Sequence, residues 1–137
     1  MLAGCGGAPP LAVAPPTPGA TAAAACGRLR AALPDKVDEG KLRPTTPKSD
    51  LTAAWRDPPV VMRCGVPAPT GIGPTTQLRS IDDVDWFTAG FEVTGPHVYT
   101  TVGRVATVEL TVPDGRVPAG ALVDLADPIK KALPTTK

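Results

Sequence analysis

The sequence predicts an α+β domain, in which a single antiparallel sheet of about five or six strands is covered on one face by an N-terminal and a C-terminal helix and held by one disulfide. Three observations predict this fold. Residues 99–113 alternate apolar and polar side chains as a β-hairpin does. Residues 24–33 and 119–133 space their apolar side chains as helices do. One cysteine, Cys26, lies in the first helical segment and another, Cys64, ends a strand.

Composition limits the domain to one modest core. The chain has 137 residues, of which 42% are hydrophobic but only 4% aromatic, so its core must be built from Val, Leu and Ala. The formal net charge is +1 and no long basic run exists, which argues against nucleic-acid binding. No apolar run reaches the roughly 18 residues that a spanning helix needs. The chain as given is therefore not expected to cross a membrane.

The first residues indicate a lipid anchor. Leu2 to Cys5, LAGC, match the lipobox of bacterial lipoproteins, in which the cysteine thiol takes a diacylglycerol. The charged and apolar segments that normally precede a lipobox are missing. Assignment of the start codon too far downstream, at Met1, or trimming within the apolar segment of the signal peptide would explain this. The alternative is a chance tetrapeptide in a tail rich in Ala and Gly. We expect acylation at Cys5.

Residues 1–25 are expected to form the lipobox remnant and a flexible linker, and residues 26–137 a single α+β domain. The linker is rich in Pro, Ala and Gly and has no charge, so it cannot bury enough surface to order itself. In polyproline geometry some 20 residues would hold the domain up to roughly 60 Å from its anchor.

The two remaining cysteines, Cys26 and Cys64, are expected to form a disulfide, as an even pair in an exported chain does. A loop of about 39 residues closed in this way would stabilise the fold by roughly 4 kcal/mol in the chain-entropy model. A metal site would need more ligands than His97 supplies, and a reactive thiol would need a neighbouring base.

The first half of the chain contains few clear elements. Cys26, Leu29 and Leu33 share one helical face. Residues 34–59 are rich in Pro and charge and predict a loop, with one short helical turn at residues 51–55 in which Trp55 anchors the loop to the core. A strand follows at residues 60–64.

Three further strands are expected at residues 77–81, 84–87 and 91–94. Asp82 and Asp83 predict a tight turn between the first two, which places Arg79 opposite Trp86.

The hairpin that follows is expected to turn at Gly103 and Arg104, with glycine supplying a positive φ. This turn places Tyr99 opposite Val108 and on the core face, and His97 opposite Leu110.

The last segment predicts a helix whose apolar stripe lies on the sheet. Pro128 interrupts it, so that either the helix kinks there or a second short helix begins there, capped by Asp127. The stripe consists of Leu122, Leu125, Ile129 and Leu133.

From about Cys26 to Leu133 the chain resembles the actinobacterial family called domain of unknown function 3515. The matching pieces are CGRLRAALPDKVDEGKLRP, AAWRDPPVVMRCGVP, VDWF and TTVGRVATVELTVP. The resemblance implies an exported or lipid-anchored envelope protein, for which the family offers no activity. Pro128 departs from the unbroken final helix expected of this family.

The candidate chemical residues each have a structural explanation as well. His97, the only histidine, is expected to be structural. Asp82, Asp83 and Asp85 are expected to form a solvated turn, because an EF-hand loop would need further acidic ligands. A set of three arginines would form an anion site if the strands brought them together, although pairing with nearby carboxylates is the plainer expectation. The arginines are Arg63, Arg79 and Arg104, and the carboxylates Asp57, Asp85 and Glu109.

Two classes of function follow. The first is a non-catalytic binding or scaffolding module at the outer face of the cytoplasmic membrane, with another envelope protein or a wall component as partner and no cofactor or metal. Its interface would be an exposed apolar patch around Trp86, Phe87 and Phe91. The second is an envelope hydrolase or transferase with a deep pocket of convergent titratable groups. The sequence contains no recognisable catalytic set, which favours the first class.

Overall fold

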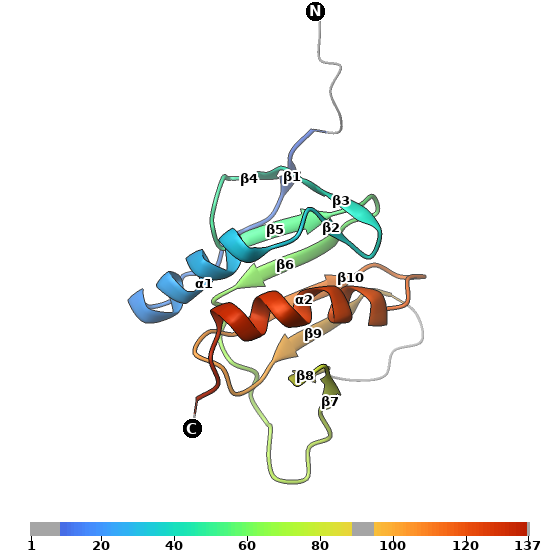
Figure 1. Ribbon diagram of the computed structural model, residues 1–137. Helices are drawn as coiled ribbons and strands as arrows, with labels where there is room; N and C mark the ends of the chain where they lie inside the picture. The colour runs from blue at the N-terminus through green and yellow to red at the C-terminus, as the bar shows by residue number, and fades with distance from the viewer. Residues whose placement is uncertain (1–8, 89–94, 137) are drawn as a thin grey trace, which may run out of the picture.

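The computed structural model describes residues 9–88 and 95–136, and it shows an α+β fold with two helices, α1 (Ala20–Ala32) and α2 (Ala119–Ala132) (Figure 1). The larger sheet has eight strands in the order β2-β3-β5-β6-β10-β9-β8-β7, with antiparallel neighbours throughout. Its strands are β2 (Lys36–Val37), β3 (Gly40–Arg43), β5 (Thr52–Trp55), β6 (Val60–Cys64), β7 (Arg79–Ile81), β8 (Val84–Phe87), β9 (His97–Thr101) and β10 (Val108–Val112). A second, two-stranded sheet pairs β1 (Leu11–Ala12) with β4 (Thr45–Thr46) in parallel.

The sheet has more strands than the five or six expected, because residues 34–59 are not a loop. The turn at Asp38 and Glu39, both with positive φ, folds β2 back on β3. Residues 52–55, expected as a helical turn, form β5. All four β5 residues are buried, so no apolar–polar alternation marks this strand in the sequence. Trp55 is buried in the core as expected, and its indole Nε1 donates to the carbonyl of Pro34.

The β9–β10 hairpin has a longer connection than expected. Tyr99 lies opposite Leu110, not Val108, and His97 lies opposite Val112. Gly103 has the expected positive φ of 80°, but its loop pairs with the end of the chain, where Val105 N–H donates to Pro134 O (3.0 Å). The register is displaced by two residues, an even number, so Tyr99 still points into the core.

The β7–β8 hairpin confirms its predicted turn. Asp82 and Asp83 both have positive φ, and Arg79 lies opposite Trp86. The strand begins at Arg79, two residues later than expected. The strand expected at residues 91–94 lies outside the described residues.

A single core lies between the sheet and the two helices, which lie on the same side of the sheet and contact each other (Figure 1). Alternate residues of β6 and β10 point into it. The disulfide between Cys26 and Cys64 forms as expected and joins α1 to β6, with 5.7 Å between the two Cα atoms. Pro128 is accommodated within one continuous α2, so no second helix begins there. The stripe of α2 is buried as predicted: Leu122, Leu125, Ile129 and Leu133.

The boundary expected between residues 25 and 26 falls inside α1, and ordered structure begins earlier. In β1, Leu11 N–H donates to Pro44 O and Val13 N–H to Thr46 O, each at 3.0 Å. Beyond β1, Arg63 Nε donates to the carbonyl of Ala14 (3.0 Å). Backbone hydrogen bonds thus order a segment whose composition alone predicts a linker. In Figure 1 this segment passes behind the sheet before entering α1.

Candidate functional site: a basic pocket beside β4

The described residues form a pocket of about 240 Å³ where the end of α1 meets β3, β4 and the loop before β5. Its walls include Arg30 from the last turn of α1, Leu42 and Arg43 from β3, Thr45 from β4, and Lys48 and Ser49 from the loop. Three of these residues are cationic and none is acidic. The composition of the walls therefore favours an anionic ligand.

Two of the three cations remain available. Arg43 Nη1 donates to the carbonyl of Arg56 (3.0 Å) and lies 3.8 Å from the carboxylate of Asp57. Among the described residues, Arg30 and Lys48 form no ion pair. Arg30 is half-buried and Lys48 exposed, so both can approach a ligand from solvent.

Local hydrogen bonds shape the loop that carries Lys48. Ser49 Oγ accepts from the backbone N–H of Leu51 (3.0 Å), which turns the chain into β5. Thr45 Oγ1 and the buried Thr52 Oγ1 share a hydrogen bond of 3.2 Å, which links β4 of the small sheet to β5 of the larger one. The Ser49 hydroxyl can still donate its proton to a ligand, because the hydrogen bond from Leu51 N–H uses only an oxygen lone pair.

The position of Arg30 follows from the helix. The face of α1 that carries Cys26 and Leu29 is fully buried, so Arg30, one residue further, projects at the margin of that face. The helix ends at Ala32, two residues before Pro34, and this leaves Arg30 in the last turn.

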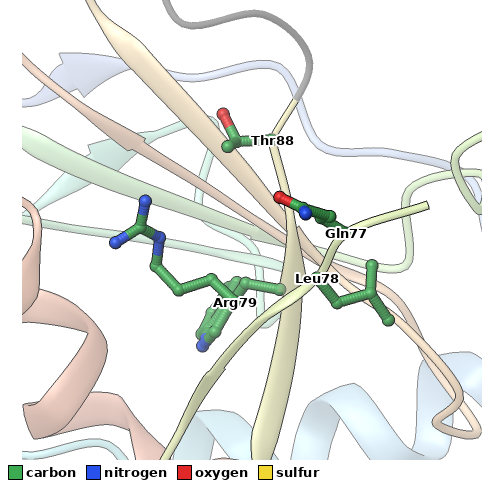
Figure 2. A pocket seen from close by; sticks show the side chains of 5 residues that line it. Gln77, Leu78, Arg79 and Thr88 are labelled. Atoms are coloured by element: carbon green, nitrogen blue, oxygen red, sulfur yellow. The ribbon is translucent and has the colours of Figure 1, made fainter. Parts of the chain in front are cut away.

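A second, smaller pocket of about 140 Å³ lies at the opposite edge of the sheet, over β7 and β8. Figure 2 shows Leu78 and Arg79 leaving the chain in opposite directions there, with Gln77 and Thr88 nearby. Arg79 is the only ionisable residue among the described walls of this pocket. One cation attracts an anionic ligand less strongly than the two available cations of the basic pocket do.

The expected interface of Trp86, Phe87 and Phe91 is not an exposed aromatic patch. Trp86 is fully buried in the core, where its Nε1 has no hydrogen-bond partner among the described residues. Phe87 is half-buried, and Phe91 lies outside the described residues. The alternation that makes β8 recognisable in the sequence also points Trp86 inward.

The three arginines considered as an anion site are not brought together. Arg63 lies on β6 and Arg79 on β7, with three strands between them. Arg63 pairs with Glu109 on β10 at 3.0 Å, the cross-strand pairing that the sequence favours. Arg104 donates to the carbonyls of Leu133 (2.7 Å) and Asp83 (3.0 Å), so it joins the hairpin loop to the chain end.

The other candidate residues occupy structural positions. His97 is half-buried in β9, opposite Val112. The Asp82–Asp83 turn is exposed, and no group of three or more His, Cys, Asp or Glu within the described ranges is arranged to hold a metal ion. Cys5 lies outside those ranges.

Comparison with known proteins places the chain in one family. The model of one family, described as "Protein of unknown function (DUF3515)", matches residues 6–137. The chain belongs to this family. No curated protein and no solved structure matches it. Within the described part of the chain, neither helix is long and apolar enough to span a bilayer.

Proposed function

We propose that this protein is an actinobacterial cell-envelope lipoprotein, anchored through Cys5 to the outer face of the cytoplasmic membrane, and that its domain is a non-catalytic binding or scaffolding module. The ligand is an anionic group of the envelope, held in the basic pocket. The membrane holds the chain through the acyl groups on Cys5, and no nucleic acid is involved.

The observation that carries this proposal is the path of the N-terminal segment. Pro44 accepts the hydrogen bond from Leu11, and Pro44 and Thr45 also form part of the pocket wall. The chain that leads from Cys5 therefore enters the fold beside the basic pocket. The Cys26–Cys64 disulfide is compatible with an oxidising compartment outside the cytoplasm.

Acylation of Cys5 is tested by detergent-phase partitioning. Expressed with a complete lipoprotein signal peptide, the wild-type chain should enter the detergent phase, and Cys5→Ala should stay in the aqueous phase because the acyl groups need the thiol. Ala8→Ser, three residues along, is the matched control and should partition like the wild type. Equal partitioning of the wild type and Cys5→Ala would rule out the anchor.

A further inference from the structure

Docking of β1 shortens the tether of the proposed anchor. The spacer expected from composition would reach roughly 60 Å, but only residues 6–10 separate Cys5 from Leu11, the first residue of β1. Six residue-to-residue steps of fully extended chain span about 20 Å at most. An acylated Cys5 would thus keep the β1–β4 pair close to the headgroups of its own membrane.

The basic pocket lies at the same end of the molecule as this tether. Figure 1 shows β1 and β4 together at the end opposite β7, and Thr45 of β4 forms part of the pocket wall. The Coulomb field of an anionic membrane surface decays over about 10 Å at ordinary ionic strength, so cations at this end can sense it.

The adjacent β2–β3 hairpin carries two exposed lysines together with two exposed carboxylates, Asp35 and Glu39. Lys36 of β2 and Lys41 of β3 lie directly opposite each other and both are exposed. Like charges in cross-strand positions repel, and a nearby anion would relieve this repulsion.

The carboxylates at this end are of two kinds. Asp57 lies 3.8 Å from Arg43, and Asp38 pairs with Arg116. Asp35, Glu39 and Asp50 are exposed and form no ion pair among the described residues.

Building on the proposed anchor, we infer that this edge of the domain faces the membrane and that the basic pocket binds the phosphate of an anionic lipid headgroup through Arg30 and Lys48. The Ser49 hydroxyl donates the third hydrogen bond. Arg43 contributes charge at the wall while its guanidinium stays bonded to Arg56. Lipid binding at the pocket orients the domain on the bilayer, which the acyl chains alone cannot do.

The test uses the full chain with Cys5→Ser, so that any membrane binding is independent of acylation. Flotation with phosphatidylcholine vesicles is compared with flotation when phosphatidylglycerol is added. Binding should require phosphatidylglycerol and weaken with salt. Each cation near an anionic surface contributes about fivefold in affinity, so Arg30→Gln/Lys48→Gln should reduce binding about 25-fold.

The matched control, Arg79→Gln/Lys131→Gln, removes the same charge from exposed cations outside the pocket and should bind nearly as the Cys5→Ser parent does. Equal losses in both double variants would mean attraction by net charge alone and would overturn the inference. If the Cys5→Ser parent chain floated equally with and without phosphatidylglycerol, the inference would be overturned as well.

Two further results separate the possible explanations. If inorganic phosphate shifts the Arg30 and Ser49 amide resonances while vesicles recruit nothing, the pocket takes a soluble phosphate and the lipid assignment is wrong. If the wild type enters detergent through Cys5 but the Cys5→Ser chain ignores vesicles, this inference fails and the anchor stands. If the wild type stays out of the detergent phase while the Cys5→Ser chain binds phosphatidylglycerol vesicles, lipid binding is supported and the anchor is ruled out.

Discussion

At the scale of single residues, two helical glycines differ in whether their surroundings leave room for a side chain. An added Cβ at Gly27 in α1 would meet nothing within 4 Å. At Gly120 in α2 it would lie 2.7 Å from Asp38 Oδ1. Asp38 cannot move freely, because its other oxygen pairs with Arg116 at 2.9 Å and its backbone N–H donates to Asp124 (2.8 Å). Gly120 thus lets the β2–β3 turn dock on α2.

Alanine at these two positions should therefore have opposite effects. Gly27→Ala should stabilise the fold by about 0.5 to 1 kcal/mol, because alanine loses less backbone entropy in a helix. Gly120→Ala should destabilise it by about 1 kcal/mol through overpacking against Asp38. Urea melts of both variants give the two free energies of unfolding. Stabilisation of similar size in both would contradict the docking of the turn on α2.

At the scale of elements, β10 organises the sheet, because it lies between β6 and β9 and alternates strictly between the two faces. Val108, Leu110 and Val112 are fully buried in the core. Glu109 and Thr111 are half-buried on the other face, where Glu109 pairs with Arg63.

Substitutions one residue apart on β10 should separate these faces. Leu110→Ala, like Val108→Ala, should cost about 2 to 4 kcal/mol through lost burial and a cavity. Thr111→Ala, like Thr107→Ala in the preceding loop, should cost under about 1 kcal/mol, since only half-buried contacts and β propensity are lost. Denaturant midpoints of the four variants provide the comparison. Larger losses from the threonine changes would reverse the assignment of the buried face.

Several strands were predictable from the sequence, but β5 and β2 were not. Residues 60–64 and 84–87 form β6 and β8 at the expected positions, and every second residue of each strand is buried. β5 is buried on both faces and shows no alternation, and β2 has only two residues, so neither produces a local pattern. The hairpin register was wrong by two residues because its loop pairs with Pro134 and Thr136, a contact that no local rule predicts.

The basic pocket was not predictable for a similar reason. Its cations come from α1, β3 and the loop before β5, and in the sequence Arg30, Arg43 and Lys48 are spaced without any motif. Only the fold brings them around one cavity. The disulfide and the inward position of Tyr99 were predictable, because residue chemistry and strand periodicity determine them locally.

At the scale of the whole molecule, the N-terminal segment decides how the domain relates to its proposed anchor. If residues 11–19 belong to the fold, the tether is short and the basic pocket stays near the membrane. If they are a free linker, the domain can move tens of ångströms away and turn in any direction. The hydrogen bonds of Leu11 and Val13 to the chain around β4 are the contacts that distinguish these arrangements.

Native-state hydrogen exchange of the full chain measures those contacts directly. The amides of Leu11 and Val13 should be protected well above the rates of an unstructured peptide, because each donates a 3.0 Å hydrogen bond to β4 or the residue before it. Protection of the β10 amides in the same sample is the internal reference for a folded sheet. Exchange of Leu11 and Val13 at unstructured rates, with β10 protected, would show a free linker and contradict the short tether.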